Sequence, residues 1–301
     1  MPPDKRLSMP FDMLPQKPTL RAGFVMILAM ASFTINDTCV KVIGPSLPVG
    51  EITAIRGIMS VMFLAVIAAR QGVLSEVPGS FNRPVLLRTL MDFLGTLLFV
   101  TALMHMPIAN LTAITQTVPL AVTALSAALL GERMGAARLA ATATGFIGVL
   151  MIVRPNPATF SVYDAIAFGI VFAVAIRDVV TKRIPLTIPA PVVALINATL
   201  VAAGGGVTAT LQGFTAPALW QIVLLALAAL FLACGYLLMV VTLRIGDISA
   251  TAPFRYSVMV FALISGMAVF REFPDFWAIA GMCVIVATGL LLARREARVQ
   301  R

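Results

Sequence analysis

Long apolar runs alternate with short polar breaks along most of this chain. A helix that crosses a bilayer needs about 20 consecutive apolar residues, and ten runs approach that length. The runs are continuous rather than alternating, which disfavours a transmembrane β-barrel. The pattern therefore predicts an all-α membrane protein with ten transmembrane helices, at 22–44, 48–69, 85–106, 108–130, 136–153, 160–182, 189–211, 217–242, 248–270 and 275–293.

The Lys and Arg residues between the runs predict the orientation of the chain. Cytoplasmic loops of membrane proteins carry an excess of these residues. With the N terminus inside, the inner segments hold sixteen Lys and Arg residues, whereas the outer links hold only Arg154 and Arg271. We therefore expect both termini in the cytoplasm, as tails at 1–21 and 295–301 that are retained rather than cleaved.

Composition agrees with a membrane protein and excludes several other classes. The chain is 60% hydrophobic and 12% charged, whereas soluble domains are nearer half apolar and a quarter charged. The net charge of +9 is scattered, with no basic face, so we expect no nucleic-acid partner. One histidine, three distant cysteines and no CxxC predict no metal or other cofactor. No GxxxxGK[ST] motif is present, so no ATPase domain is expected in this chain.

The chain also repeats itself. Residues 103–154 align without a gap on the residues 140 positions later, and nearer the start of each half the offset becomes 141. Each copy holds five apolar runs, an odd number, so the second copy should cross the membrane in the opposite sense. The sequence therefore predicts two inverted five-helix repeats, at 22–155 and 156–294, an arrangement typical of transporters.

Several segments resemble the EamA family of the drug/metabolite transporter superfamily. Residues 102–152 are similar to the family's first-half motif, residues 52–66 to its second span, and residues 252–292 to the second copy of the motif. The residues that carry the likeness are Arg56 in the second run, Pro119 in the fourth, and Gly131, Glu132 and Arg133 at its end.

The resemblance implies a ten-helix inverted-repeat transporter in the bacterial inner membrane. It also implies export or exchange of small metabolites, amino acids prominently among them, with a lipid bilayer and a small-molecule substrate as partners. Arg271 departs from the family, because the second copy of the motif has glycine before its glutamate. We interpret Arg271 as an interface detail, and Glu132 and Glu272 as helix-end structural residues.

Charged residues within the runs are candidate functional residues, because a charge near the bilayer centre costs about 2.5–3.5 kcal/mol on insertion scales. Asp37 and Lys41 are one helical turn apart and can form a salt bridge; their counterparts at the offset of 141 are Asp178 and Lys182. Two interpretations stay open: lysines that snorkel and neutralise the aspartates, or two gates at opposite membrane faces. Asp92 is expected to pair with Arg88, one turn away, or to act as a cavity acid or proton site.

Two arginines break the repeat and are candidate substrate ligands. Arg56 corresponds to Asn197, and Arg255 corresponds to Thr115. A guanidinium can bind a carboxylate with two parallel hydrogen bonds. The alternative for Arg56 is a structural role, bonded to carbonyls or to Asp92. Two neighbouring residues are expected to bind substrate by hydrogen bonds, namely Gln116 and Tyr256.

The sequence thus predicts an alternating-access transporter of small metabolites, most favourably amino acids, working as an exporter or facilitator. Nucleosides or organic acids are alternative cargoes. A membrane-embedded enzyme is a further alternative, which the absence of a convincing nucleophile–base pair disfavours, and no catalytic residue is assigned. The oligomeric state stays open.

Overall fold

The computed structural model describes residues 18–118, 120–122, 124–125, 136–153, 161–181, 183–185, 187–245 and 254–299. Every regular element in these segments is helical. The elements are α1 (Pro18–Ile43), α2 (Val49–Arg70), η1 (Leu74–Glu76), η2 (Pro78–Ser80), α3 (Arg83–His105), α4 (Ile108–Thr115), α6 (Ala136–Val153), α7 (Val162–Thr181), α8 (Ala190–Gln212), α9 (Leu219–Ile245), α11 (Ser257–Phe270) and α12 (Phe276–Val299).

The helices follow the apolar runs closely, and most begin and end within a few residues of the predicted bounds. Five stretches within the described residues are long and apolar enough to cross a membrane, and shorter apolar helices such as Ser257–Phe270 accompany them. Large apolar side chains are widely exposed, including Leu211 at 81% and Leu219 at 77%, as expected for surfaces that face lipid. The described residues form the helical bundle of a multi-pass membrane protein; ten crossings stay a prediction.

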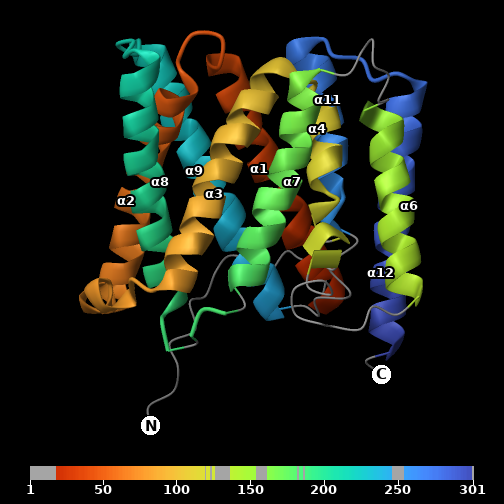
Figure 1. The fold of residues 1–301 in the computed structure, drawn as a ribbon, viewed down its shortest axis with the longest axis horizontal. Coiled ribbons are helices and arrows are strands. Elements are labelled where there is room, and N and C mark those ends of the chain that lie inside the picture. The colour runs from red at the N-terminus through yellow and green to blue at the C-terminus, as the bar shows by residue number, and fades with distance from the viewer. Residues whose placement is uncertain are drawn as a thin grey trace.

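The two halves of the chain pack on each other through four helix pairs. The most extensive contacts join α1 to α9, α2 to α8, α3 to α7, and α6 to α12. In Figure 1, α2 and α8 lie at one side of the bundle, and α6 and α12 lie at the opposite side. Each pair combines one helix from before residue 155 with one from after it, so the interface between the halves runs through the whole molecule.

Small residues bring α2 and α8 close together. A Cβ atom added at Gly57 would lie 2.8 Å from the Cβ of Ala202, which leaves no room for a larger residue. The amide of Gly50 donates a hydrogen bond to the side chain of Gln212 at 2.9 Å. Interfaces between helices in membranes commonly use glycine and alanine in this way, because small residues let the backbones approach.

Candidate functional site

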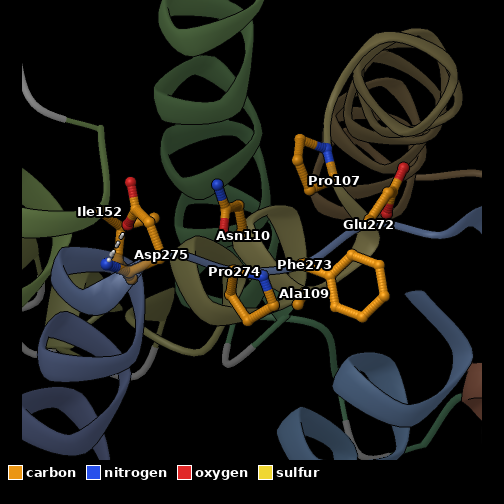
Figure 2. A pocket seen from close by; sticks show the side chains of 9 residues that line it. Pro107, Ala109, Asn110, Ile152, Glu272, Phe273, Pro274 and Asp275 are labelled. Atoms are coloured by element: carbon orange, nitrogen blue, oxygen red, sulfur yellow. Dashed lines mark hydrogen bonds between the residues drawn. The ribbon is translucent and has the colours of Figure 1, made fainter. Parts of the chain in front are cut away.

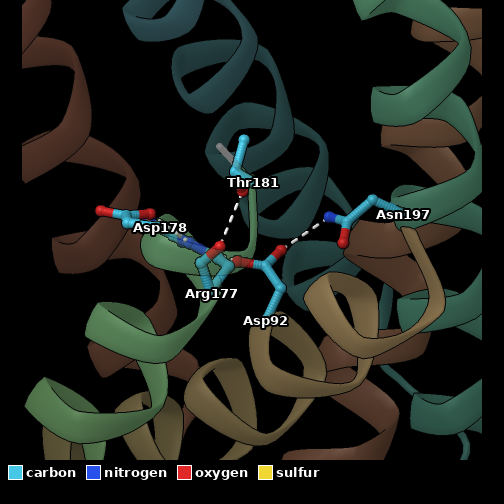
Figure 3. A network of polar contacts seen from close by, with 5 residues as sticks. All are labelled: Asp92, Arg177, Asp178, Thr181 and Asn197. Atoms are coloured by element: carbon cyan, nitrogen blue, oxygen red, sulfur yellow. Dashed lines mark hydrogen bonds and ion pairs between the residues drawn. The ribbon is translucent and has the colours of Figure 1, made fainter. Parts of the chain in front are cut away.

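A polar network joins α3, α7 and α8. The carboxylate of Asp92 accepts hydrogen bonds from Arg177 Nη1 and from Asn197 Nδ2, both at 2.6 Å. Arg177 also donates from Nε to Asp178 at 2.9 Å, and its carbonyl accepts from Thr181. Figure 3 shows the two aspartates on either side of the guanidinium. Asp92 lies nine residues into α3, about 14 Å from its start at 1.5 Å per residue, which is near the middle of a bilayer core.

The predicted pairing of Asp92 with Arg88 is wrong. Asp92 uses one oxygen for Arg177 and the other for Asn197, because α7 and α8 both pack on α3. Arg88 makes no hydrogen bond or ion pair within the described residues, and its Nε and Nη1 atoms are buried without a partner. Close packing of helices has therefore overridden the one-turn spacing.

A second, looser network joins α1 and α2. The side-chain amide of Asn36 donates to Asp37 Oδ1 at 2.8 Å. Arg56 Nη1 donates to Asn36 Oδ1 at 3.4 Å, a long hydrogen bond. Arg56 also interacts electrostatically with Asp37, Asp92 and Tyr236. The two networks therefore lie within electrostatic reach of each other.

The offset of 141 residues relates the two networks. It places Asn36 on Arg177, Asp37 on Asp178, and Arg56 on Asn197. The aspartate is kept, whereas the arginine and the asparagine exchange places between the two halves. Each pair of corresponding helices, α1 with α2 and α7 with α8, therefore supplies one aspartate, one arginine and one asparagine, and Asp92 of α3 adds a second aspartate to the network of the second half.

Tyr236 of α9 interacts electrostatically with members of both networks. Its ring meets the ring of Phe33 of α1 edge to face, with centroids 5.3 Å apart. It interacts electrostatically with Asp92, Arg177, Arg56 and Arg88, which come from three other helices. Yet 57% of its surface is accessible. The tyrosine therefore combines an accessible surface with charged neighbours from three other helices. Sequence reasoning missed this residue.

A tighter ion pair closes the end of α1. Lys41 Nζ lies 2.5 Å from Glu272 Oε1 and donates to the carbonyl of Met106. The other oxygen of Glu272 accepts from the amide of Ile108 at 3.0 Å, at the start of α4. The Phe270 ring lies 4.9 Å from the ammonium. We call Lys41, Glu272, Met106 and Ile108 the latch, because they tie α1, the α3–α4 link and the α11–α12 link together.

The predicted pairing of Lys41 with Asp37 is also wrong, since Lys41 pairs with Glu272 and Asp37 is bonded by Asn36. Lys182, the counterpart of Lys41, lies outside the described residues, as do Pro119 and the Gly-Glu-Arg motif at 131–133. Thr38, one turn before the latch, shares a hydrogen bond of 2.6 Å with Ser265 of α11. The end of α1 is therefore held to α11 and the segment after it at two levels.

Arg271, the departure from the family motif, precedes Glu272 and has φ 55°. This left-handed conformation favours glycine, which explains why glycine suits the position. A pocket beside the latch is lined by Pro107, Ala109, Asn110, Ile152, Glu272, Phe273, Pro274, Asp275 and Ala278 (Figure 2). Its carboxylates already have structural partners: Glu272 in the latch, and Asp275 as acceptor from the Ala278 amide at 2.9 Å.

The remaining candidates gather elsewhere. The side chain of Gln116 donates to the carbonyl of Arg255 at 3.4 Å. Arg255 is exposed and Tyr256 is partly buried, close to Gly289 of α12. No hydrogen bond or ion pair within the described residues links these three side chains to the network around Tyr236. Nor do the described residues contain a group of three or more His, Cys, Asp or Glu suited to a metal ion.

Comparison with known proteins identifies the class. The EamA-like transporter family matches residues 20–154. An S-adenosylmethionine uptake transporter of Rickettsia bellii is 25% identical over 281 residues, covering 90% of this chain and 92% of that protein. A riboflavin transporter of Brucella anthropi is 30% identical over 224 residues, covering 69% and 75%. The pseudopaline exporter CntI of Pseudomonas aeruginosa is 29% identical over 288 residues, covering 92% and 98%.

A solved crystal structure matches with a TM-score of 0.61 at 19% identity, covering 91% of this chain and 97% of that chain, which shows the fold alone. The helical bundle and the transporter relatives together define a multi-pass membrane transporter of small metabolites. The chain belongs to the EamA-like transporter family.

Proposed function

We propose that this protein carries a small polar metabolite across the bacterial inner membrane by alternating access, and that the cargo binds beside Tyr236. The observation that carries the proposal is the gathering of charges from α2, α3 and α7 around an accessible tyrosine of α9. Charges within a membrane protein typically mark substrate pathways. Arg56, one of the expected substrate ligands, belongs to this group.

The cargo is better described by its polarity than as an amino acid. The relatives' names give S-adenosylmethionine, riboflavin and pseudopaline as their substrates, and none supports the narrower expectation of an amino acid. All three are small metabolites with many hydrogen-bonding groups. A site with arginine, aspartate, asparagine and tyrosine side chains offers both donors and acceptors to such a molecule.

Two inverted repeats would give this site alternating access. The packed helix pairs support this. In the repeat, α1 corresponds to α7 and α3 to α9, so the pair α1–α9 has its counterpart in the pair α7–α3. The pairs α2–α8 and α6–α12 each join two corresponding helices. The matching networks at the offset of 141 support it as well. In transporters of this design, a site between the repeats opens to alternate sides as the two halves exchange conformations.

The latch supports a gate at the outer side. With the N terminus inside, Lys41 lies near the outer end of α1, and its ion pair with Glu272 holds α1 against the α11–α12 link. Breaking and remaking this pair would let the outer ends of α1 and α11 separate. The corresponding inner gate would pair Lys182 with Glu132, the residues that align with Lys41 and Glu272 in the repeat.

Counterflow in proteoliposomes tests the proposal. We expect saturable exchange of at least one member of a labelled panel that contains S-adenosylmethionine, riboflavin, amino acids, nucleosides and organic acids. Asp92→Asn should reduce that exchange at least tenfold, whereas Arg83→Gln, at the exposed start of α3, should leave it unchanged. If the wild-type protein exchanges no member of the panel, the proposal is contradicted.

A further inference from the structure

Arg88 of α3 has no hydrogen-bond or ion-pair partner among the described residues. Its Nε and Nη1 atoms are buried, and neither has a hydrogen-bond partner within the described residues. It interacts electrostatically with Tyr236, whose side chain is accessible over more than half of its surface. A buried donor without an acceptor is unfavourable by about 1–3 kcal/mol, and by more when the group is charged, so this guanidinium favours an acceptor brought by a ligand.

Arg88 differs from Arg177 and Arg56 because the neighbouring acids already have other partners. Arg177 pairs with both Asp92 and Asp178. Arg56 bonds Asn36 and interacts with Asp37. Asp92 lies one turn from Arg88, but Arg177 and Asn197 take its two oxygens.

We infer that Arg88 binds a carboxylate group of the transported metabolite. The inference rests on the proposed function and narrows its cargo to metabolites that carry a single carboxylate near their polar end. A hydrogen-bonded guanidinium–carboxylate pair would satisfy the buried donors. A dianionic phosphate ester fits less well, because its second negative charge adds to the repulsion from Asp92, one turn from Arg88, that a monocarboxylate also meets.

The test removes the carboxylate from the ligand and the guanidinium from the protein, separately and together. The probes are two matched pairs: S-adenosylmethionine with its decarboxylated form, and methionine with methionine amide. Glycerol phosphate serves as the phosphate competitor. The variants are Arg88→Gln and Arg88→Lys, with Arg83→Gln as the control on the same helix, and the readouts are equilibrium binding to purified protein and counterflow in proteoliposomes.

For a carboxylate probe that the wild-type protein binds, Arg88→Gln should weaken binding about 10- to 100-fold, the usual worth of a hydrogen bond to a charged group. The decarboxylated partner of that probe should bind the wild-type protein weakly and should be insensitive to the substitution. Arg88→Lys should recover part of the affinity, since it keeps the charge but loses the planar donors. Arg83→Gln should change neither probe.

Equal binding of the two members of a pair, or stronger competition by glycerol phosphate, overturns the role of Arg88 and leaves the proposed function standing. A uniform loss for both members of a pair in Arg88→Gln likewise overturns it, since a general structural role would produce that result. If Arg88→Gln does not fold, the comparison of Arg88→Lys with the wild-type protein on the same pair decides the question. Absence of binding and exchange for the whole panel overturns the proposed function itself.

Discussion

The two networks around Tyr236 use the same three residue types but differ in how firmly they are bonded. In the second half, Arg177 has two aspartate partners and its contact with Asp92 is 2.6 Å. In the first half, the Arg56 side chain makes one hydrogen bond within the part of the chain that the structure describes, of 3.4 Å, to Asn36. The exchange of arginine and asparagine between the halves has left one guanidinium held by acids and the other held by an amide.

This difference separates a structural role from a binding role. A guanidinium between two carboxylates is already neutralised and fixed, so it stabilises the packing of α3 on α7. A loosely bonded guanidinium beside an accessible tyrosine can rearrange around a ligand at little cost. We therefore expect substitutions in the second network to affect stability, and substitutions at Arg56 to affect transport with little effect on stability.

The largest effect is expected for Asp92→Ala. It leaves Arg177 with Asp178 alone and Asn197 without its acceptor. Removing one member of a fully buried ion pair costs about 3–5 kcal/mol, which sets an upper bound for this partly buried pair. The unfolding midpoint measured in detergent should fall markedly, and transport should be lost. Asp164→Ala provides the control, because the bonds of the Asp164 side chain among the described residues are with Ser161 at the start of α7, and such a cap contributes about 1 kcal/mol. An unfolding midpoint for Asp92→Ala equal to that of the control would contradict a structural role for the second network.

Arg56→Gln should give an intermediate effect, confined to transport. Because its one hydrogen bond is long, we expect a small change in the unfolding midpoint and a loss of about tenfold in counterflow, as for the removal of one charged ligand contact. Arg177→Gln, measured alongside, should lower both quantities. If Arg56→Gln destabilises the protein as much as Arg177→Gln does, the distinction between the two networks fails.

A smaller gain in stability is expected for Arg271→Gly, which tests the segment that carries Glu272 rather than the networks. The left-handed φ of 55° disfavours any side chain by roughly 1–2 kcal/mol, although the flexibility of glycine offsets part of this. The unfolding midpoint should therefore rise, with a gain of about 1 kcal/mol or less. A lower midpoint in this variant would show that the arginine side chain contributes more than its backbone costs.

The smallest effect is expected for Arg255→Lys. Arg255 is exposed, and within the described residues only its carbonyl has a recorded bond, from Gln116. A lysine keeps the positive charge, so binding affinity and exchange rate should change less than about twofold. A selective loss of affinity for carboxylate probes would support Arg255 as a substrate ligand, and would contradict a binding site beside Tyr236.

The sequence predicted the helices well, because an apolar run long enough to cross the membrane leaves few alternatives to a helix. It did not predict the partners of the charges. Lys41 and Asp92 each pair with a residue from another part of the chain and not with the residue one turn away. The packing of the helices determines these pairs. The exchange of arginine and asparagine between the two halves is visible in the sequence, because the offset of 141 aligns Asn36 with Arg177. Nothing in the sequence distinguishes Tyr236 from an ordinary interfacial tyrosine.

The most direct test of alternating access asks whether the latch closes the outer side. Thr38→Cys, introduced after replacing Cys39, Cys234 and Cys283 by alanine, places a thiol one turn beneath Lys41. Its rate of modification by a membrane-impermeant maleimide, added from outside, is measured with the latch intact, with Glu272→Gln, and with Asp275→Asn as the control in the same link.

We predict slow modification with the latch intact and in the control, and a rate about tenfold higher with Glu272→Gln, which corresponds to a shift of roughly 1.4 kcal/mol toward the open form. Equal rates in all three proteins would contradict a gate at Lys41 and Glu272.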